Sequence, residues 1–105
     1  MAIRYSNGIG KLYDTESQQP MGEVKYQITE IDKTRYTPNK WWGEFSAKRE
    51  IKRPGKYIIE LEDTRKGECV VTANTEAPKG SRSQFHYYYH FNGRGKLGRH
   101  FSYGS

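Results

Sequence analysis

Apolar and polar side chains alternate with a period of two along much of this chain. Residues 22–28 place Val, Tyr and Ile between charged or polar neighbours, and the same alternation returns in residues 56–62 and 68–73. A strand with one buried and one solvent-facing side produces this pattern, because successive side chains point to opposite faces. No window shows the 3.6-residue period of an amphipathic helix. The sequence therefore predicts β-strands.

Turn-forming residues divide these segments. All four prolines, which cannot donate to a strand ladder, stand between the apolar segments, and a hairpin turn is predicted in Asp63–Gly67. We expect six strands and a seventh, short one, at residues 9–13, 22–31, 41–48, 56–62, 68–74, 84–91 and 99–103. A chain of 105 residues has the length of one ordinary domain. The predicted fold is an all-β domain spanning residues 1–105, a small antiparallel barrel or sandwich of six to seven strands, meander-like, with little or no helix.

The expected core is thin in aliphatic side chains. Leu, Ile, Val and Phe together supply only 17 of the 105 residues, a share at which charged chains are often disordered. Nine Tyr and two Trp offset this, because each aromatic ring buries a large area when it packs. We expect a tyrosine-rich core, and a thin core of this kind favours association with a second copy of the chain.

Positive charge is concentrated near the C-terminus. The formal net charge is +6, yet residues 1–76 hold 13 Lys and Arg against 12 Asp and Glu. Residues 77–105 hold no acid and five basic residues: Lys79, Arg82, Arg94, Lys96 and Arg99. A basic region of this kind favours a partner that carries negative charge.

The same region contains FHYYYHF, residues 85–91, in which every side chain carries a ring. Its odd-numbered positions, all Phe or Tyr, continue the apolar face of the other segments, so we expect them in the core. Its even-numbered positions face outward: His86, Tyr88 and His90. The two histidines stand about 13 Å apart on an extended strand, too far to share one metal ion. No metal site and no other cofactor are expected.

Trp42 is a second candidate for an outward-facing ring. In KWWGEF, alternation that directs Trp41 and Phe45 inward leaves Trp42 on the solvent side. An outward Trp exposes a large apolar area. This indicates either a face covered by a loop or a second subunit, or a platform for a base or another flat ring.

The remaining motifs do not predict catalysis. GRGKLG, residues 93–98, matches the dinucleotide-binding pattern, but neither a βαβ unit nor a following acid accompanies it, so a basic hairpin turn is expected there. Cys69 lies on the apolar face of its strand and is expected to be a small buried hydrophobe. We therefore expect a protein that is not an enzyme.

Two hypotheses remain for the function. The first is a non-enzymatic binding module for single-stranded nucleic acid or another polyanion, in which rings stack on bases and cations contact phosphates. Its candidate residues are Trp42, His86, Tyr88, His90, Arg82, Arg94, Lys96 and Arg99. The alternative is a homodimeric protein-interaction or structural domain that uses the same aromatic surface.

The expected location is the cytoplasm. The N-terminal residues lack the apolar segment of a signal peptide, and no stretch approaches the ~18 apolar residues of a membrane helix, so no association with a membrane is expected. A single cysteine forms no intramolecular disulfide and fits a reducing compartment.

Overall fold

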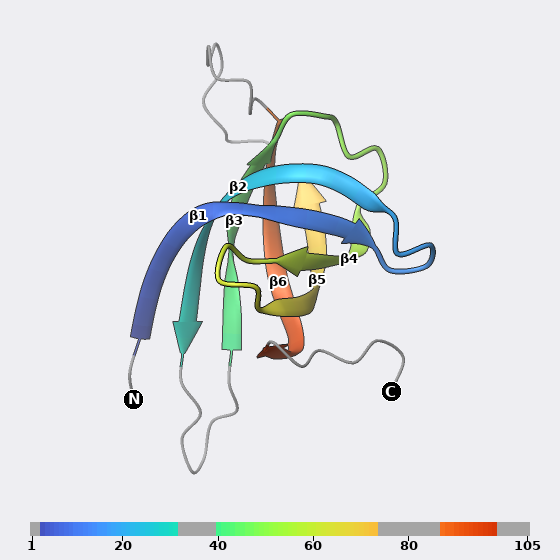
Figure 1. Cartoon of the computed structure of the whole chain (residues 1–105). Helices are drawn as coiled ribbons and strands as arrows, with labels where there is room; N and C mark the ends of the chain where they lie inside the picture. Colours follow the sequence, from blue (N-terminus) through green and yellow to red (C-terminus); the bar gives the residue numbers. More distant parts are fainter. Residues whose placement is uncertain (1–2, 32–39, 74–86, 99–105) are drawn as a thin grey trace.

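The computed structural model describes residues 3–31, 40–73 and 87–98, which form a closed barrel of six antiparallel strands (Figure 1). The strands are β1 (Ile3–Asp14), β2 (Pro20–Ile31), β3 (Lys40–Ala47), β4 (Gly55–Glu60), β5 (Lys66–Ala73) and β6 (Tyr87–Gly98). Their order around the barrel is β1-β2-β3-β6-β5-β4, and the described residues contain no helix. The predicted all-β fold is confirmed, and it is a barrel rather than a sandwich.

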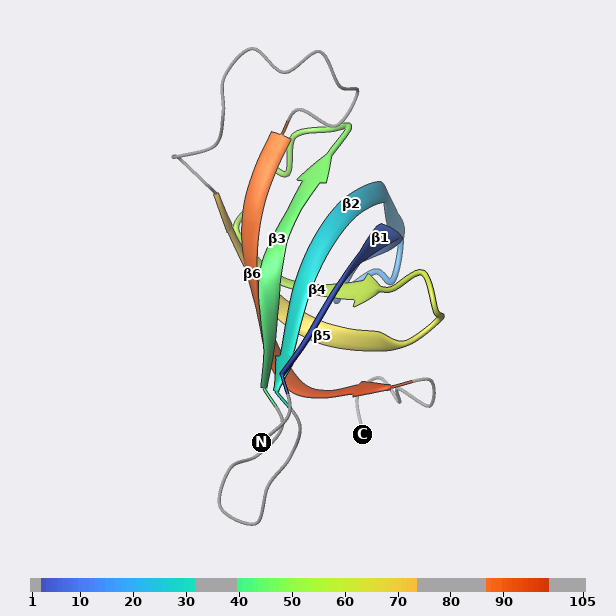
Figure 2. The same ribbon diagram turned by 90° about the vertical axis from the view of Figure 1, so that its left-hand side faces the viewer.

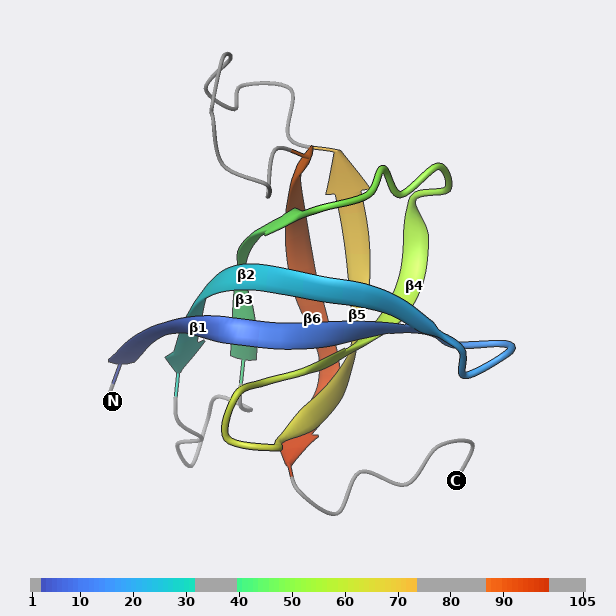
Figure 3. The ribbon, with the colours of Figure 1, turned by 45° about the horizontal axis from the view of Figure 1, so that its top comes forward.

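Two three-stranded meanders make up this barrel. β1-β2-β3 and β4-β5-β6 join along β3 with β6 and along β1 with β4. Residues 48–54, here named the end plug, carry the chain from the first meander to the second across one end of the barrel (green in Figure 3). Ile51 of the end plug is buried, and its backbone N–H donates to the Tyr89 hydroxyl at 2.6 Å. This contact fastens the end plug to β6.

Tyrosines supply part of the core, as expected, and their hydroxyls reach the ends of the barrel. The Tyr26 hydroxyl accepts a hydrogen bond from the backbone N–H of Glu62 at 3.0 Å. The Tyr57 hydroxyl donates to the backbone carbonyl of Arg53 at 2.6 Å. Each ring is therefore buried while its polar atom is paired, which a buried tyrosine requires. The largest fully buried side chains are Phe45, Phe91, Leu12, Ile28, Ile59, Val24, Val71 and Cys69.

Most of the detailed predictions hold where the structure describes the residues. Tyr89 and Phe91 are buried and Tyr87 packs against the core, as the alternation predicted. The predicted hairpin turn lies between β4 and β5, closed by a hydrogen bond from the N–H of Leu61 to the carbonyl of Arg65 at 2.8 Å. The predicted strand at 99–103 lies outside the described residues.

The prediction of a hairpin turn at residues 93–98 is wrong, because β6 continues through this segment to Gly98. Gly93 packs directly against the Trp41 ring: a Cβ at this position would lie 2.1 Å from Cε2 of the indole. The indole Nε1–H donates to the carbonyl of Gly95 at 3.0 Å, and Gly95 itself has a φ of 76°. The glycines therefore make room for Trp41 and bend the strand around it, instead of reversing the chain.

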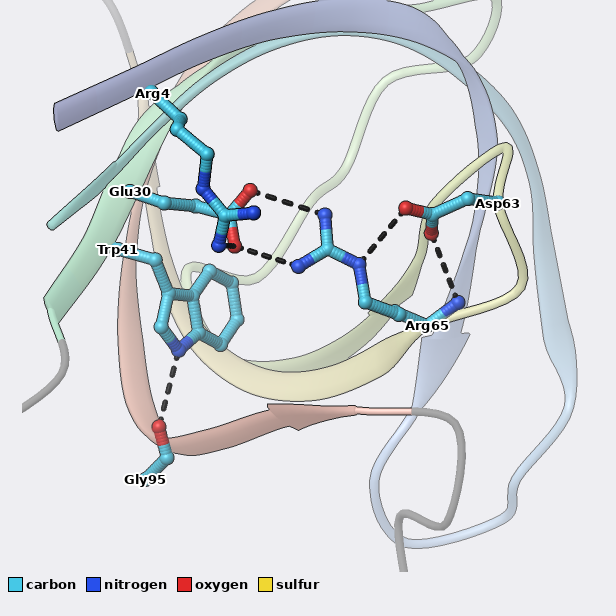
Figure 4. A network of polar contacts seen from close by, with 6 residues as sticks. All are labelled: Arg4, Glu30, Trp41, Asp63, Arg65 and Gly95. Carbon is cyan, nitrogen blue, oxygen red and sulfur yellow. Dashed lines mark hydrogen bonds and ion pairs between the residues drawn. The ribbon is translucent and has the colours of Figure 1, made fainter. Parts of the chain in front are cut away.

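A network of ion pairs closes the other end of the barrel (Figure 4). Glu30 points inward from β2, and its carboxylate accepts two hydrogen bonds from the guanidinium of Arg65 at 2.6 and 3.0 Å. Asp63 contacts the same guanidinium at 2.8 Å, and Arg4 lies 3.8 Å from Glu30. These hydrogen bonds raise the pKa of Arg65 above its ordinary value, with Glu30 as the main cause. These ion pairs thus cover the apolar interior at this end of the barrel.

Candidate functional site

β1, β2, β3 and β6 pair in this order as one continuous part of the sheet, and its outer face is turned towards the viewer in Figure 2. Strand register orders its outward side chains into rows that cross all four strands. One row is Tyr5, Thr29, Trp42 and Asn92. The next is Asn7, Gln27, Glu44 and His90. Residues from three separate segments of the chain therefore become neighbours on this surface.

All residues of these two rows except Asn92 line an open groove of about 500 Å³. The Trp42 ring lies in it with 38% of the residue exposed, and Tyr5 is 77% exposed at its edge. Trp42 and His90 are diagonal neighbours on paired strands, so their Cα atoms are about 7–8 Å apart. The groove thus offers flat rings beside the amide groups of Asn7 and Gln27, which can both donate and accept hydrogen bonds.

One carboxylate lies inside the groove. Glu44 Oε1 is 3.5 Å from Nδ1 of His90, an ion pair when the imidazole is protonated. Both side chains are about half exposed, at 57% for Glu44 and 44% for His90, so both are accessible to a ligand. Among the residues that the structure describes, no Lys or Arg lines the groove itself. The groove is therefore suited to uncharged rings that carry hydrogen-bonding edges, rather than to an anion.

Cations flank the groove instead. Lys25 lies one row beyond Gln27, and Lys40 lies one row beyond Trp42 on the other side. Arg94 extends the outer face of β6 past Asn92, opposite Glu68 of β5. All three basic residues are exposed. The resulting arrangement has rings and amides in the centre and positive charge along both margins.

The structure brings together part of the predicted site. Trp42, Tyr88, His90 and Arg94 share this outer face of β3 and β6. Tyr88 is opposite Ser46, about 13 Å along the strands from Trp42, and it is half-buried. Lys96 belongs to β6, but its side chain is not described, and three residues lie outside the described ranges: Arg82, His86 and Arg99.

Sequence reasoning missed the half of the groove that comes from β1 and β2. Tyr5 and Asn7 precede the first predicted strand, which was expected at 9–13, whereas β1 begins at Ile3. Gln27 was correctly placed on a polar strand face but was not considered a site residue. Alternation of Ile3, Tyr5 and Ile9 on one face is the sequence signal that points to the longer strand.

Other chemistry has little support among the described residues. No group of three or more His, Cys, Asp or Glu side chains converges there to hold a metal ion. Cys69 is completely buried, and this burial raises the pKa of its thiol to about 12, so little nucleophilic thiolate forms near neutral pH. Within the same ranges no helix is long and apolar enough to span a membrane.

The chain was compared with protein families, with curated proteins and with solved structures. No protein family, no curated protein and no solved structure matches it.

Proposed function

We propose that the outer face of β1, β2, β3 and β6 binds single-stranded nucleic acid. The observation that carries this proposal is the exposed Trp42 ring in an open groove that also contains Tyr5 and His90. Bases stack on such rings regardless of their identity, and each stacked base contributes about 1–3 kcal/mol. The basic composition of the chain, at +6, agrees with an anionic partner.

The distribution of charge favours one orientation of the strand. Glu44 in the groove repels phosphates, while Lys25 and Lys40 flank the groove on opposite sides. Bases therefore enter the groove and the sugar–phosphate backbone follows its margins. A duplex, whose bases are stacked inside and whose phosphates face outward, does not fit this arrangement.

The amide groups supply hydrogen bonds to base edges without demanding one sequence. Asn7 and Gln27 each present a donor and an acceptor, and Glu44 accepts from exocyclic amino groups such as N4 of cytosine. The groove therefore accommodates several bases, with a preference for those that carry an amino group over uracil or thymine.

The test is a fluorescence-anisotropy titration of the full chain with labelled single-stranded RNA and DNA at two salt concentrations. Trp42→Ala is expected to weaken binding about 5- to 150-fold, the equivalent of one stacked base. Met21→Ala is the matched control, because Met21 has the same exposed fraction of 38% and lies outside the groove. Met21→Ala should bind as the wild type does.

Two outcomes would contradict the proposal. One is an equal effect of Trp42→Ala and Met21→Ala. The other is competition by heparin as strong as that by unlabelled RNA, which would mean simple attraction of charges. A failure to bind nucleic acid, together with self-association that Trp42→Ala abolishes, would favour the protein-interaction alternative.

A further inference from the structure

The first half of β1 is an exposed strand edge. β1 pairs with β2 from Ile3 to Tyr13, but it pairs with β4 only from Lys11 to Asp14. Residues 3–7 are all exposed. Within the described strands, nothing pairs with the second edge of these residues. In Figure 1 this part of β1 curves down at the left margin of the sheet, with β2 and then β3 to its right.

The unpaired backbone groups on this edge can be assigned. The N–H of Ile9 points away from β2, because it donates to the Glu62 side chain at 3.4 Å. Backbone groups of alternate residues point to the same edge of a strand. The N–H and C=O groups of Ile3, Tyr5 and Asn7 therefore face this edge as well. A row of such groups is a template for another strand.

The side chains favour burial of this edge rather than its exposure. Ile3, Tyr5 and Ile9 are 50%, 77% and 46% exposed on one face of β1. Natural edge strands usually carry charges, especially lysine, that prevent pairing. Residues 3–7 contain a single charged residue, Arg4, and it lies 3.8 Å from Glu30 of the same chain. No row of like charges opposes pairing here.

We propose that this edge pairs antiparallel with the same edge of a second copy of the chain. With the two-fold axis at Tyr5, the two Tyr5 residues face each other and Ile3 faces Asn7 of the other copy. Each of these three pairs exchanges two hydrogen bonds, so about six bonds satisfy all the exposed groups at once. The edge is thus complementary to itself, which a two-fold interface requires.

This pairing would join two candidate sites into one surface. Tyr5 and Asn7 line the groove, so the grooves of the two copies meet at the axis. The two Trp42 residues would then stand roughly 24 Å apart, five strand spacings of about 4.8 Å. The dimer does not depend on the proposed ligand, and neither of its tests requires nucleic acid.

The first test is sedimentation equilibrium of the full chain, whose monomer mass is 12.3 kDa. We expect a reversible dimer of twice this mass. Tyr5→Lys places two like charges across the axis and should raise the dimer dissociation constant at least tenfold. Met21→Lys adds the same charge at another exposed apolar position and should leave the dissociation constant within twofold. A wild type that stays monomeric up to submillimolar concentration overturns the proposal, as does an equal effect of the two variants.

The second test fixes the register by cross-linking. In this register the Cα atoms at position 5 are about 5.5 Å apart, within the range that a disulfide spans. The Cα atoms at position 7 are roughly 13 Å apart, which is too far. Tyr5→Cys should therefore form a covalent dimer under mild oxidation, whereas Asn7→Cys should not, and the native Cys69 is fully buried. Equal yields, or cross-linking at position 7 alone, contradict the register.

Discussion

Gly93→Ala is expected to destabilise the barrel by more than its size suggests. The added Cβ would lie 2.1 to 2.5 Å from three atoms of the Trp41 indole, so the ring must move by about 1.5 Å to reach ordinary contact distance. The ring has little room to do so. Gly67 lies against it from β5, where a Cβ would be 2.6 Å from the ring, and Phe91 packs 6.1 Å away between ring centroids.

Two contributions set the loss of unfolding free energy that is expected for Gly93→Ala. Overpacking a tight core costs about 1–3 kcal/mol. Displacement of the ring also breaks the 3.0 Å hydrogen bond from Trp41 Nε1 to Gly95 and leaves a buried donor unpaired, which costs a further 1–3 kcal/mol or so. The expected loss is roughly 2–6 kcal/mol, a large part of the 5–15 kcal/mol that stabilises a typical domain.

Urea unfolding followed by circular dichroism measures this loss. Gly98→Ala is the matched control, since nothing lies within 4 Å of a Cβ at that position, and it should change stability by less than about 0.5 kcal/mol. A smaller ring in Trp41→Phe should reduce the penalty of Gly93→Ala in the double variant. If Gly93→Ala and Gly98→Ala unfold at the same urea concentration, the explanation of the glycines through Trp41 is refuted.

Three further predictions concern the ends and the interior of the barrel. Glu30→Ala leaves a partly buried guanidinium without its main partner and should cost roughly 2–4 kcal/mol in urea unfolding, whereas Glu16→Ala, in an exposed turn, should cost less than about 0.5. Tyr89→Phe leaves a backbone N–H of the end plug unpaired and should cost about 1–3 kcal/mol; an equal cost for Tyr88→Phe on the outer face would contradict this. Burial raises the pKa of Cys69 from 9.0 to about 12, so its contribution to stability is complete below pH 9 and is lost as the pH rises towards 12. The stability difference between wild type and Cys69→Ala should therefore shift by about 1–3 kcal/mol between pH 8 and 11 in favour of the variant, and parallel pH profiles would refute this.

The barrel was predictable because most inward positions of its strands are apolar and alternate with polar outward positions. Alternation in β2 and β5 reports burial directly, and it also placed Trp42 outward, as observed. In β4 this rule holds for Tyr57 and Ile59 but not for Ile58, which is buried as well. The rule fails where the interior is not apolar. In the first half of β1 the inward positions include Arg4 and Gly8, because this end of the barrel is filled by the Glu30–Arg65 pair and by the Tyr26 hydroxyl. The inward face of that half of the strand therefore carries no apolar alternation, and the only apolar signal is on its outward face, at Ile3, Tyr5 and Ile9.

The glycines of β6 show a second limit. A glycine indicates either a turn or a close approach of another group, and both are common. Which one applies to Gly93 depends on Trp41, 52 positions earlier in the sequence. Local sequence does not carry that information.

The same limit applies to the candidate site. The alternation of side chains along each strand placed Trp42 and His90 on the outer face. Only the register between strands shows which residues of β1 and β2 lie beside them, namely Tyr5, Asn7 and Gln27. Register depends on which strands pair, and that pairing was not specified by the sequence patterns. The residues found in advance were thus those of β3 and β6, where unusual aromatic content drew attention to them.

The most direct test of the proposed binding surface uses the two tryptophans of the chain. Each tryptophan contributes one indole N–H signal to an NMR spectrum, and one ring is inside the barrel while the other is in the groove. On addition of single-stranded RNA, the account predicts a large, saturable shift of the Trp42 indole signal. The Trp41 signal, held by its hydrogen bond to Gly95, should stay unchanged. Saturable binding without movement of the Trp42 signal, or with equal movement of both signals, would contradict the account.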